Sequence, residues 1–387
     1  MRPQTQQAEA QSPAAKRSPL LIQPYSDEWS EAVAEFNQRV KYANAPFQLP
    51  ETPAADWLPK TGNRKPYQEI FLAVQGCSVR GSYTFKNQDF SVGGRIREVG
   101  MCRMPISEGV VDGRFALIGV CLLKDAARRQ PLLYALGIGS LDAVITRLAL
   151  AMGWEVIQVV PFHFKVNNGF QFLRNVRHVR STRWRGLLLD AAAYSGAGWA
   201  GARFADAVLT RNGHRGVCAE QVSELGAWTN QIWRACQPHY SMIAVRDRAV
   251  LNVLYPSEER RFIRLKILDG SSVIGWAVLL DTVMSENKYF GNMRVGTIVD
   301  CLAAPENASR VMAVASQFLE QRGVDVMVSN QSHPAWSWGL KRAGFLRGPS
   351  NFFFVASREL KTLLSEIDPQ GTGFHLNRGD GDGPIHL

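Results

Sequence analysis

Gly76-Cys77-Ser78-Val79-Arg80-Gly81 recurs in the second half of the chain as Gly270-Ser271-Ser272-Val273-Ile274-Gly275. Each copy lies in the turn and second arm of a predicted β-hairpin. Two further pairs keep nearly the same offset: Arg103-Met104-Pro105 corresponds to Ala303-Ala304-Pro305, and Gly153-Trp154 corresponds to Gly344-Phe345. The offset is far too long for a solenoid repeat, so the sequence predicts two similar domains in tandem.

The same order of elements is predicted in both halves: helix, hairpin, a strand ending near proline, helix, strand, a helix ending at Gly-aromatic, and strand. In the first half, for example, Leu141, Val144, Ile145, Leu148 and Met152 form one apolar stripe at helical spacing. The expected first-half ranges are 26–40, 69–74, 79–85, 95–104, 115–127, 131–137, 140–152 and 156–164. The expected second-half ranges are 223–236, 262–268, 273–280, 295–302, 305–322, 324–329, 334–343 and 351–356.

The fold class expected from this order is α/β (α+β), with two domains that each contain a mixed, mostly antiparallel sheet flanked by helices. The expected boundaries are a disordered tail over 1–20, a first domain over 21–185, a helical linker over 186–216, a second domain over 217–367, and a Gly/Asp-rich tail over 368–387. The last segment is either mobile or folded back across a cleft. Phe374, His375 and Leu376 are the residues that suggest folding back, because disordered tails are poor in such side chains.

Composition limits the classes of function. The net charge is +10, and no acid occurs between Glu155 and Asp190, so this stretch is either a site for a polyanion or a solvated basic face. The six cysteines and seven histidines are dispersed, so we expect reduced thiols, no metal site and a cytoplasmic protein. No apolar run is long enough to span a membrane, and no secretory signal opens the chain.

The repeated element order resembles the GNAT acyltransferase fold, over about residues 21–360. The helix that ends in Gly-aromatic before a strand is the family's recurrent feature, present here at Gly153-Trp154 and Gly344-Phe345. In that family the third strand splays from the next strand, and the gap receives the pantetheine arm of acyl-CoA. The resemblance therefore implies acetyl-CoA or another acyl-CoA as co-substrate, with its pyrophosphate at a helix N-terminus.

The resemblance also implies a pyrophosphate-binding loop after the third strand. In the first half this loop offers Ser107, Gly109, Gly113 and Arg114, which supply glycines, a hydroxyl and a cation without the family's usual spacing. The corresponding loop over 305–310 contains no glycine. We therefore expect the cofactor in the first half, while an ordinary strand-to-helix loop remains the alternative.

Acyl transfer to an amine needs a base, and GNAT enzymes often use a carboxylate on or beside the splayed strand. Asp300 and Glu98 lie on those strands, and His333 opens the last helix of the second half beside polar residues. These three residues are the catalytic candidates, each with a structural alternative as a paired or capping group. The tyrosine that often protonates the thiolate is replaced by Ala149 and Leu340.

Three functions stay open. The first is an N-acyltransferase that moves an acyl group from acyl-CoA to an amine; loose resemblance to tandem GNAT proteins of bacterial envelope and exopolysaccharide systems suggests an amino sugar or polysaccharide precursor as acceptor. The second is a catalytically silent tandem scaffold. The third is a Fem-type aminoacyl-tRNA-dependent ligase. The expected partner is a small-molecule or saccharide acceptor, and nucleic acid enters only as tRNA under the third alternative.

Overall fold

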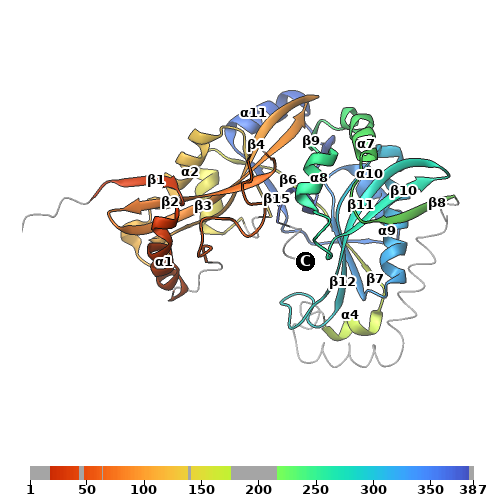
Figure 1. The fold of residues 1–387 in the computed structure, drawn as a ribbon, viewed down its shortest axis with the longest axis horizontal. Coiled ribbons are helices and arrows are strands. Elements are labelled where there is room, and N and C mark those ends of the chain that lie inside the picture. The colour runs from red at the N-terminus through yellow and green to blue at the C-terminus, as the bar shows by residue number, and fades with distance from the viewer. Residues whose placement is uncertain (1–17, 43–47, 63, 138–140, 176–215, 383–387) are drawn as a thin grey trace, which may run out of the picture.

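Two mixed sheets, each flanked by helices, form the two lobes of the molecule in Figure 1. The computed structural model describes residues 18–42, 48–62, 64–137, 141–175 and 216–382. The expected fold class, two domains of helices packed on mixed sheets, is confirmed.

The first sheet has the strand order β1-β2-β3-β4-β5-β15-β6. β9 pairs with β3, and β16 pairs with β9. The strands are β1 (Leu20–Pro24), β2 (Tyr67–Gln75), β3 (Ser78–Val92), β4 (Arg95–Ser107), β5 (Leu133–Leu136), β6 (Glu155–Val159), β9 (Met242–Ala244), β15 (Phe353–Ala356) and β16 (Phe374–His375). The helices packed on this sheet are α1 (Ser30–Tyr42), α2 (Ile118–Arg129), α3 (Val144–Ala151) and α11 (Arg358–Ile367).

The second sheet has the strand order β14-β7-β13-β12-β11-β10-β8. Its strands are β7 (Phe162–Val166), β8 (Val217–Val222), β10 (Ile263–Asp269), β11 (Ser272–Val283), β12 (Arg294–Ala303), β13 (Val326–Asn330) and β14 (Leu346–Gly348). The helices of this half are α4 (Gly169–Asn175), α7 (Trp228–Cys236), α8 (Arg248–Leu254), α9 (Ala308–Gln321) and α10 (Pro334–Arg342). The largest apolar core among the described residues lies between α7, α8, α9 and α10 and the strands β10, β11 and β12, whereas α4 packs on a separate, smaller cluster.

The sequence repeat corresponds to a repeat in backbone geometry. Gly76 and Gly270 turn the hairpins β2–β3 and β10–β11 with φ angles of 60° and 58°. A methyl group on Gly81 would lie 2.8 Å from the Ile106 carbonyl oxygen, and one on Gly275 would lie 2.6 Å from the Leu302 carbonyl oxygen. Each hexapeptide therefore ends in a glycine because the backbone of the neighbouring strand, β4 or β12, leaves no room for a methyl group, and a side chain of helix α2 or α9 packs over the same point.

Each half contributes a strand to the interior of the other half's sheet. β7, from the first half, lies between β13 and β14, whereas β15, from the second half, lies between β5 and β6. The single strand expected over 156–164 is wrong, because Pro161 lacks a backbone donor and separates β6 from β7, which enter different sheets. The sheets therefore do not follow the boundaries expected at 185 and 217.

The ends of the chain differ from a simple tail-and-linker description. β1 begins at Leu20 and pairs along β2, although 1–20 was expected to be disordered. Residues 1–17 and all but Gly216 of the expected linker over 186–216 lie outside the described residues. The strand expected to end near Pro105 continues to Ser107. No helix among the described residues combines the length and the apolar character needed to cross a membrane.

We predict that Gly275→Ala destabilises the protein by about 1–3 kcal/mol, because the new methyl group would overlap the Leu302 carbonyl and the helix above it. Gly113→Ala is the matched control, since nothing lies within 4 Å of a methyl group there. Urea unfolding followed by circular dichroism measures both. Equal midpoints for the two variants would contradict the packing role of Gly275.

Candidate functional site

Each sheet contains one opening between two parallel strands. In the first sheet, β4 and β5 pair only at Gly100–Leu133 and Met101–Tyr134, and β4 then continues to Ser107. In the second sheet, the pairing of β12 with β13 ends at Ile298–Ser329, and β12 continues to Ala303. We call these the first and second openings. In both, the strand that continues stays paired on its other side, to β3 or to β11.

The second opening is occupied by the chain's own C-terminal segment, which we define as residues 374–382. The His375 Nε2 atom lies 2.9 Å from the Cys301 carbonyl oxygen on β12. On the other side, Asn377 forms a bridge with Gln331, and the Ser332 amide donates to the Leu376 carbonyl at 2.9 Å. The segment is therefore hydrogen-bonded to both sides of the opening.

Aromatic stacking supports this placement. The His375 ring stacks on Tyr240 and on Trp336, with centroid distances of 4.8 and 5.3 Å. Burial lowers the pKa of His375 well below its usual value, so the ring is neutral and fits an apolar site. The segment was expected to be either mobile or folded back, and its buried residues fold back between the two halves.

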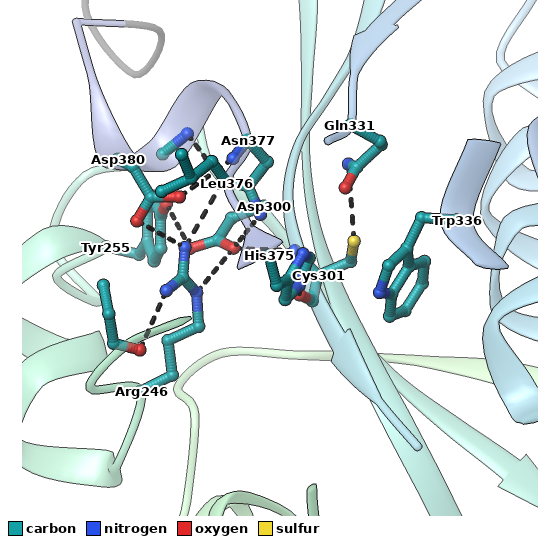
Figure 2. Close-up of polar contacts among 12 residues, drawn as sticks. Arg246, Tyr255, Asp300, Cys301, Gln331, Trp336, His375, Leu376, Asn377 and Asp380 are labelled. Atoms are coloured by element: carbon teal, nitrogen blue, oxygen red, sulfur yellow. Dashed lines mark hydrogen bonds and ion pairs between the residues drawn. The ribbon is translucent and has the colours of Figure 1, made fainter. Parts of the chain in front are cut away.

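Arg246 lies at the centre of a buried ionic cluster (Figure 2). Its Nε donates to Asp300 at 2.9 Å, and its Nη2 donates to Asp380 at 2.8 Å. Asp300 also accepts from the Tyr255 hydroxyl at 2.9 Å and from the Asn377 side-chain amide at 2.8 Å. The Arg246 side chain is 1% exposed and both carboxylates are fully buried. The cluster thus joins β12 to the C-terminal segment.

The cluster continues into the first sheet. The Lys86 ammonium, on β3, donates to the Asp380 carbonyl at 3.2 Å, and the Tyr134 hydroxyl, on β5, donates to the same carbonyl at 2.8 Å. Arg103 lies at the start of the stretch of β4 that is no longer paired with β5, and it forms an ion pair with Asp382. The C-terminal segment therefore contacts both sheets, and at the first opening it does so through these side chains.

Charges in the cluster balance. Lys86, Arg103 and Arg246 face Asp300, Asp380 and Asp382. Burial opposes the charge of Arg246, but Asp300 and Asp380 outweigh it and raise the pKa of this side chain.

Burial acts in the opposite direction on two other members of the cluster. It lowers the pKa of Lys86 to about 8, although Asp380 opposes the shift. It also raises the pKa of Asp380, against the effect of Arg246. Lys86 and Asp380 therefore keep their charges only because oppositely charged partners are present. A buried charge without a partner is strongly unfavourable in free energy.

The three catalytic candidates lie in different surroundings. Asp300 is a fully buried member of the cluster. Glu98, on β4, is 41% exposed and forms an ion pair with Lys65, which lies just before β2. His333 caps α10, accepting from the Ala335 amide at 3.2 Å, and its ring meets Tyr240 edge-on. Burial lowers the pKa of His333 to about 4. The structure thus brings Asp300 and His333 to the two sides of the C-terminal segment, whereas Glu98 forms a separate ion pair.

The expected cofactor loop lies at the end of the first opening. Ser107 ends β4, Gly109 lies in a 3-10 turn, and Gly113 and Arg114 lie in a second 3-10 turn before α2. A methyl group on Gly109 would lie 2.9 Å from the Ala116 Cα atom, so packing of the two turns requires this glycine. Space around Gly113 is open, and the Arg114 side chain is 73% exposed and forms a surface ion pair with Asp112.

Sequence reasoning missed the partners of Asp300. Arg246 follows an apolar run that becomes β9, and Lys86 lies within a long strand with neighbours on both faces. Asp380 belongs to the Gly/Asp-rich stretch, whose composition is typical of a loop. One local signal was available in the spacing of Asn377 and Asp380, which form a capping box. Each side chain accepts a hydrogen bond from the backbone amide of the other residue. Among the described residues, no group of His, Cys, Asp or Glu could hold a metal ion.

Similar solved structures identify the fold. Saccharomyces cerevisiae N-myristoyltransferase with bound myristoyl-CoA and inhibitors is similar over 90% of this chain and 81% of its own, with a TM-score of 0.51 and 11% identity. A conserved protein of unknown function from Enterococcus faecalis V583, a probable N-acyltransferase, is similar over 90% of this chain and 74% of its own, with a TM-score of 0.50 and 11% identity. The protein has a tandem GNAT fold.

Other comparisons add less. A GCN5-related N-acetyltransferase from Anabaena variabilis ATCC 29413 has a TM-score of 0.45 and 12% identity; the match covers 74% of this chain and 62% of the other chain, so this protein spans less than two thirds of that one. No family model and no curated protein matches the sequence. The likeness is therefore one of fold, and function has to be argued from the site.

In the tandem GNAT fold both openings are the splayed strands expected from the sequence. The second differs from the first because the C-terminal segment lies inside it. Beyond the first opening, α2 points its N-terminus at the loop that contains Gly113 and Arg114.

We predict that Asp300→Asn destabilises the protein by about 3–5 kcal/mol, because Arg246 would keep a buried charge with one partner removed. Glu98→Gln, which removes the other strand carboxylate, should cost about 1 kcal/mol or less, because its ion pair with Lys65 is on the surface. Urea unfolding compares the two variants. If Asp300→Asn lowers the free energy of unfolding by as little as Glu98→Gln does, the cluster is not essential to the fold.

Proposed function

We propose that this protein is an N-acyltransferase that uses acyl-CoA, acetyl-CoA among the candidates, and that acyl-CoA binds in the first opening. The observation that carries the proposal is the asymmetry of the two openings. In the second, residues 375–377 hydrogen-bond to the backbone on both sides, so the pantetheine arm would have to displace a buried segment. In the first, side chains of the sheet hold the segment instead: Tyr134 donates to the Asp380 carbonyl, and Arg103 pairs with Asp382.

The loop and helix beside the first opening fit a pyrophosphate. α2 is a 12-residue helix, so its N-terminal amides and its dipole favour an anion. Arg114 forms a surface ion pair with Asp112, and its guanidinium lies 6.0 Å from the centroid of the Phe115 ring. A surface ion pair contributes little, so it can be exchanged for a phosphate. Behind the loop, Arg39 and Arg80 both pair with the buried Glu108, so the charge of this carboxylate is compensated. We therefore assign Ser107, Gly113 and Arg114 to the phosphate end of acyl-CoA, and Gly109 to the shape of the loop.

The reaction needs a carboxylate near the opening to accept the proton of the acceptor amine. We assign this role to Asp382, because Arg103 holds it at the start of the unpaired stretch of β4. Asp300, whose oxygens accept from Arg246, Tyr255 and Asn377, is assigned to positioning the C-terminal segment. His333 and Glu98 stay as alternative bases. Ala149 and Leu340 replace the tyrosine that usually protonates the CoA thiolate, so solvent supplies this proton. An ordinary thiol has a pKa near 8.5, which makes the thiolate a fair leaving group.

The acceptor in this proposal is a primary amine on a small molecule or saccharide, an amino sugar or polysaccharide precursor being the class we favour. A cytoplasmic location follows from the use of acyl-CoA. Release of free thiol from acetyl-CoA in the presence of glucosamine tests the reaction. A protein that binds acetyl-CoA but transfers to no amine would instead be a silent scaffold.

We predict that the full chain binds one acetyl-CoA and that Arg114→Glu weakens this binding about tenfold or more, because a cation at the pyrophosphate becomes an anion. Arg310→Glu is the matched control in the second half, since Arg310 lies in the first turn of α9 as Arg114 lies before α2. Isothermal titration calorimetry measures both. Weaker binding for Arg310→Glu alone would place the cofactor in the second half.

A further inference from the structure

A cavity of about 480 Å³ lies between the two halves, outside the residues assigned to acyl-CoA. One wall is formed by residues within 56–61 together with Arg64 and Pro66, which precede β2, and the other by residues within 252–262, between α8 and β10. Small-molecule sites in proteins have volumes of about 300–1,000 Å³ and occur preferentially at domain interfaces. In size and position the cavity therefore suits a ligand.

Trp57 connects this cavity to the ionic cluster. It lines the cavity. The Lys86 ammonium lies 5.1 Å and the Arg103 guanidinium 5.4 Å from the centroid of its ring. Arg103 in turn pairs with Asp382, the carboxylate that we assign as the base. A ligand in contact with Trp57 would thus be one side chain away from the first opening.

The wall that holds Trp57 is fixed in a strained conformation. Leu58 has a φ angle of 56°, which is unfavourable for a leucine, and such strain persists only where surrounding contacts determine it. Those contacts belong to the other half: Leu58 is 5% exposed and packs in the core that contains Tyr255 and Phe262. Leu58 therefore anchors Trp57 at the interface of the two halves.

The polar groups of the cavity indicate what kind of ligand it fits. The Asn252 side-chain oxygen is buried and has no hydrogen-bond partner among the described residues, so a donor from a ligand would satisfy it. Asp56 and Glu259 balance Arg64 and Arg261 along the walls. A lining of balanced charge does not select a polyanion such as a nucleotide. It suits a neutral or singly cationic polar molecule.

We propose that this cavity binds the acyl acceptor, and that the acceptor is an amino-bearing saccharide of one or two rings. The apolar C–H face of a sugar ring packs on the flat surface of Trp57, and its hydroxyls pair with Asn252 and the charged side chains. Asp56 and Glu259 compensate the ammonium group before it is deprotonated for reaction. The assignment as acceptor rests on the proposed function, whereas the saccharide site can be tested without it.

Calorimetry without acyl-CoA tests the site on the full chain, with three probes: the β-1,4-linked glucosamine disaccharide, cellobiose as its amine-free counterpart, and the dipeptide Ala-Ala. We expect the glucosamine disaccharide to bind most tightly, and Trp57→Ala and Asn252→Leu each to weaken it at least about tenfold. Trp338→Ala is the matched tryptophan control, because Trp338 is 56% exposed on α10. It should bind like the unmodified protein.

Glu259→Gln gives a second test that does not depend on packing, since Glu259 is exposed. It should weaken the glucosamine disaccharide and leave cellobiose unchanged. Tighter binding of the dipeptide, no binding of the disaccharide, or unchanged affinity in Trp57→Ala and Asn252→Leu would overturn the proposal. If the unmodified protein binds the saccharide but does not bind acetyl-CoA, the proposed function is wrong and the saccharide site is retained.

Discussion

The pairing of the Arg246 guanidinium with Asp300 and Asp380 is the interaction on which the rest of the structure depends. Asp300 belongs to the second sheet, Asp380 belongs to the C-terminal segment, and Lys86 brings the first sheet to the same place. A buried pair of this kind contributes modestly when complete, but loss of one member leaves a charge that burial penalises heavily. The C-terminal segment is therefore held between the halves by the cost of leaving Arg246 unpaired.

This constraint gives two copies of one fold different roles. The exchange of β7 and β15 makes each sheet incomplete without the other half, so the halves are fixed to each other as a unit. The C-terminal segment then occupies the opening of one half and reaches the edge of the other. A duplicated scaffold thus presents one filled opening, one opening beside a helix N-terminus, and a cavity at the interface between the halves.

Features set by short-range geometry could be predicted from the sequence. Gly76 and Gly270 require left-handed turns, and Gly81 and Gly275 require close packing, so the duplication is visible in residue types alone. The exchange of strands could not be predicted, because nothing local tells a short strand which sheet it will join. Pro161 was the one indication that the run over 156–164 is broken.

Only part of the candidate site was predicted, because its members are far apart in the sequence. An acid within an apolar strand must have a partner or a function, which singled out Asp300. Its partner Arg246 is 54 residues away in sequence, and no pattern connects the two. The Gly/Asp-rich composition around Asp380 is typical of an exposed loop, whereas the burial of the segment depends on cavities and charges supplied by both halves.

Hydrogen exchange of the backbone amides in the C-terminal segment tests the central claim most directly, because it reports whether residues 374–382 are held inside the folded protein. The Leu376 amide donates to the Ser332 hydroxyl at 2.7 Å and the Asn377 amide to Asp380 at 2.9 Å, both at buried residues. We predict that these amides exchange as slowly as those of β12, and that Arg246→Met accelerates them selectively. Exchange at the rate of an unstructured peptide in the unmodified protein would contradict the account.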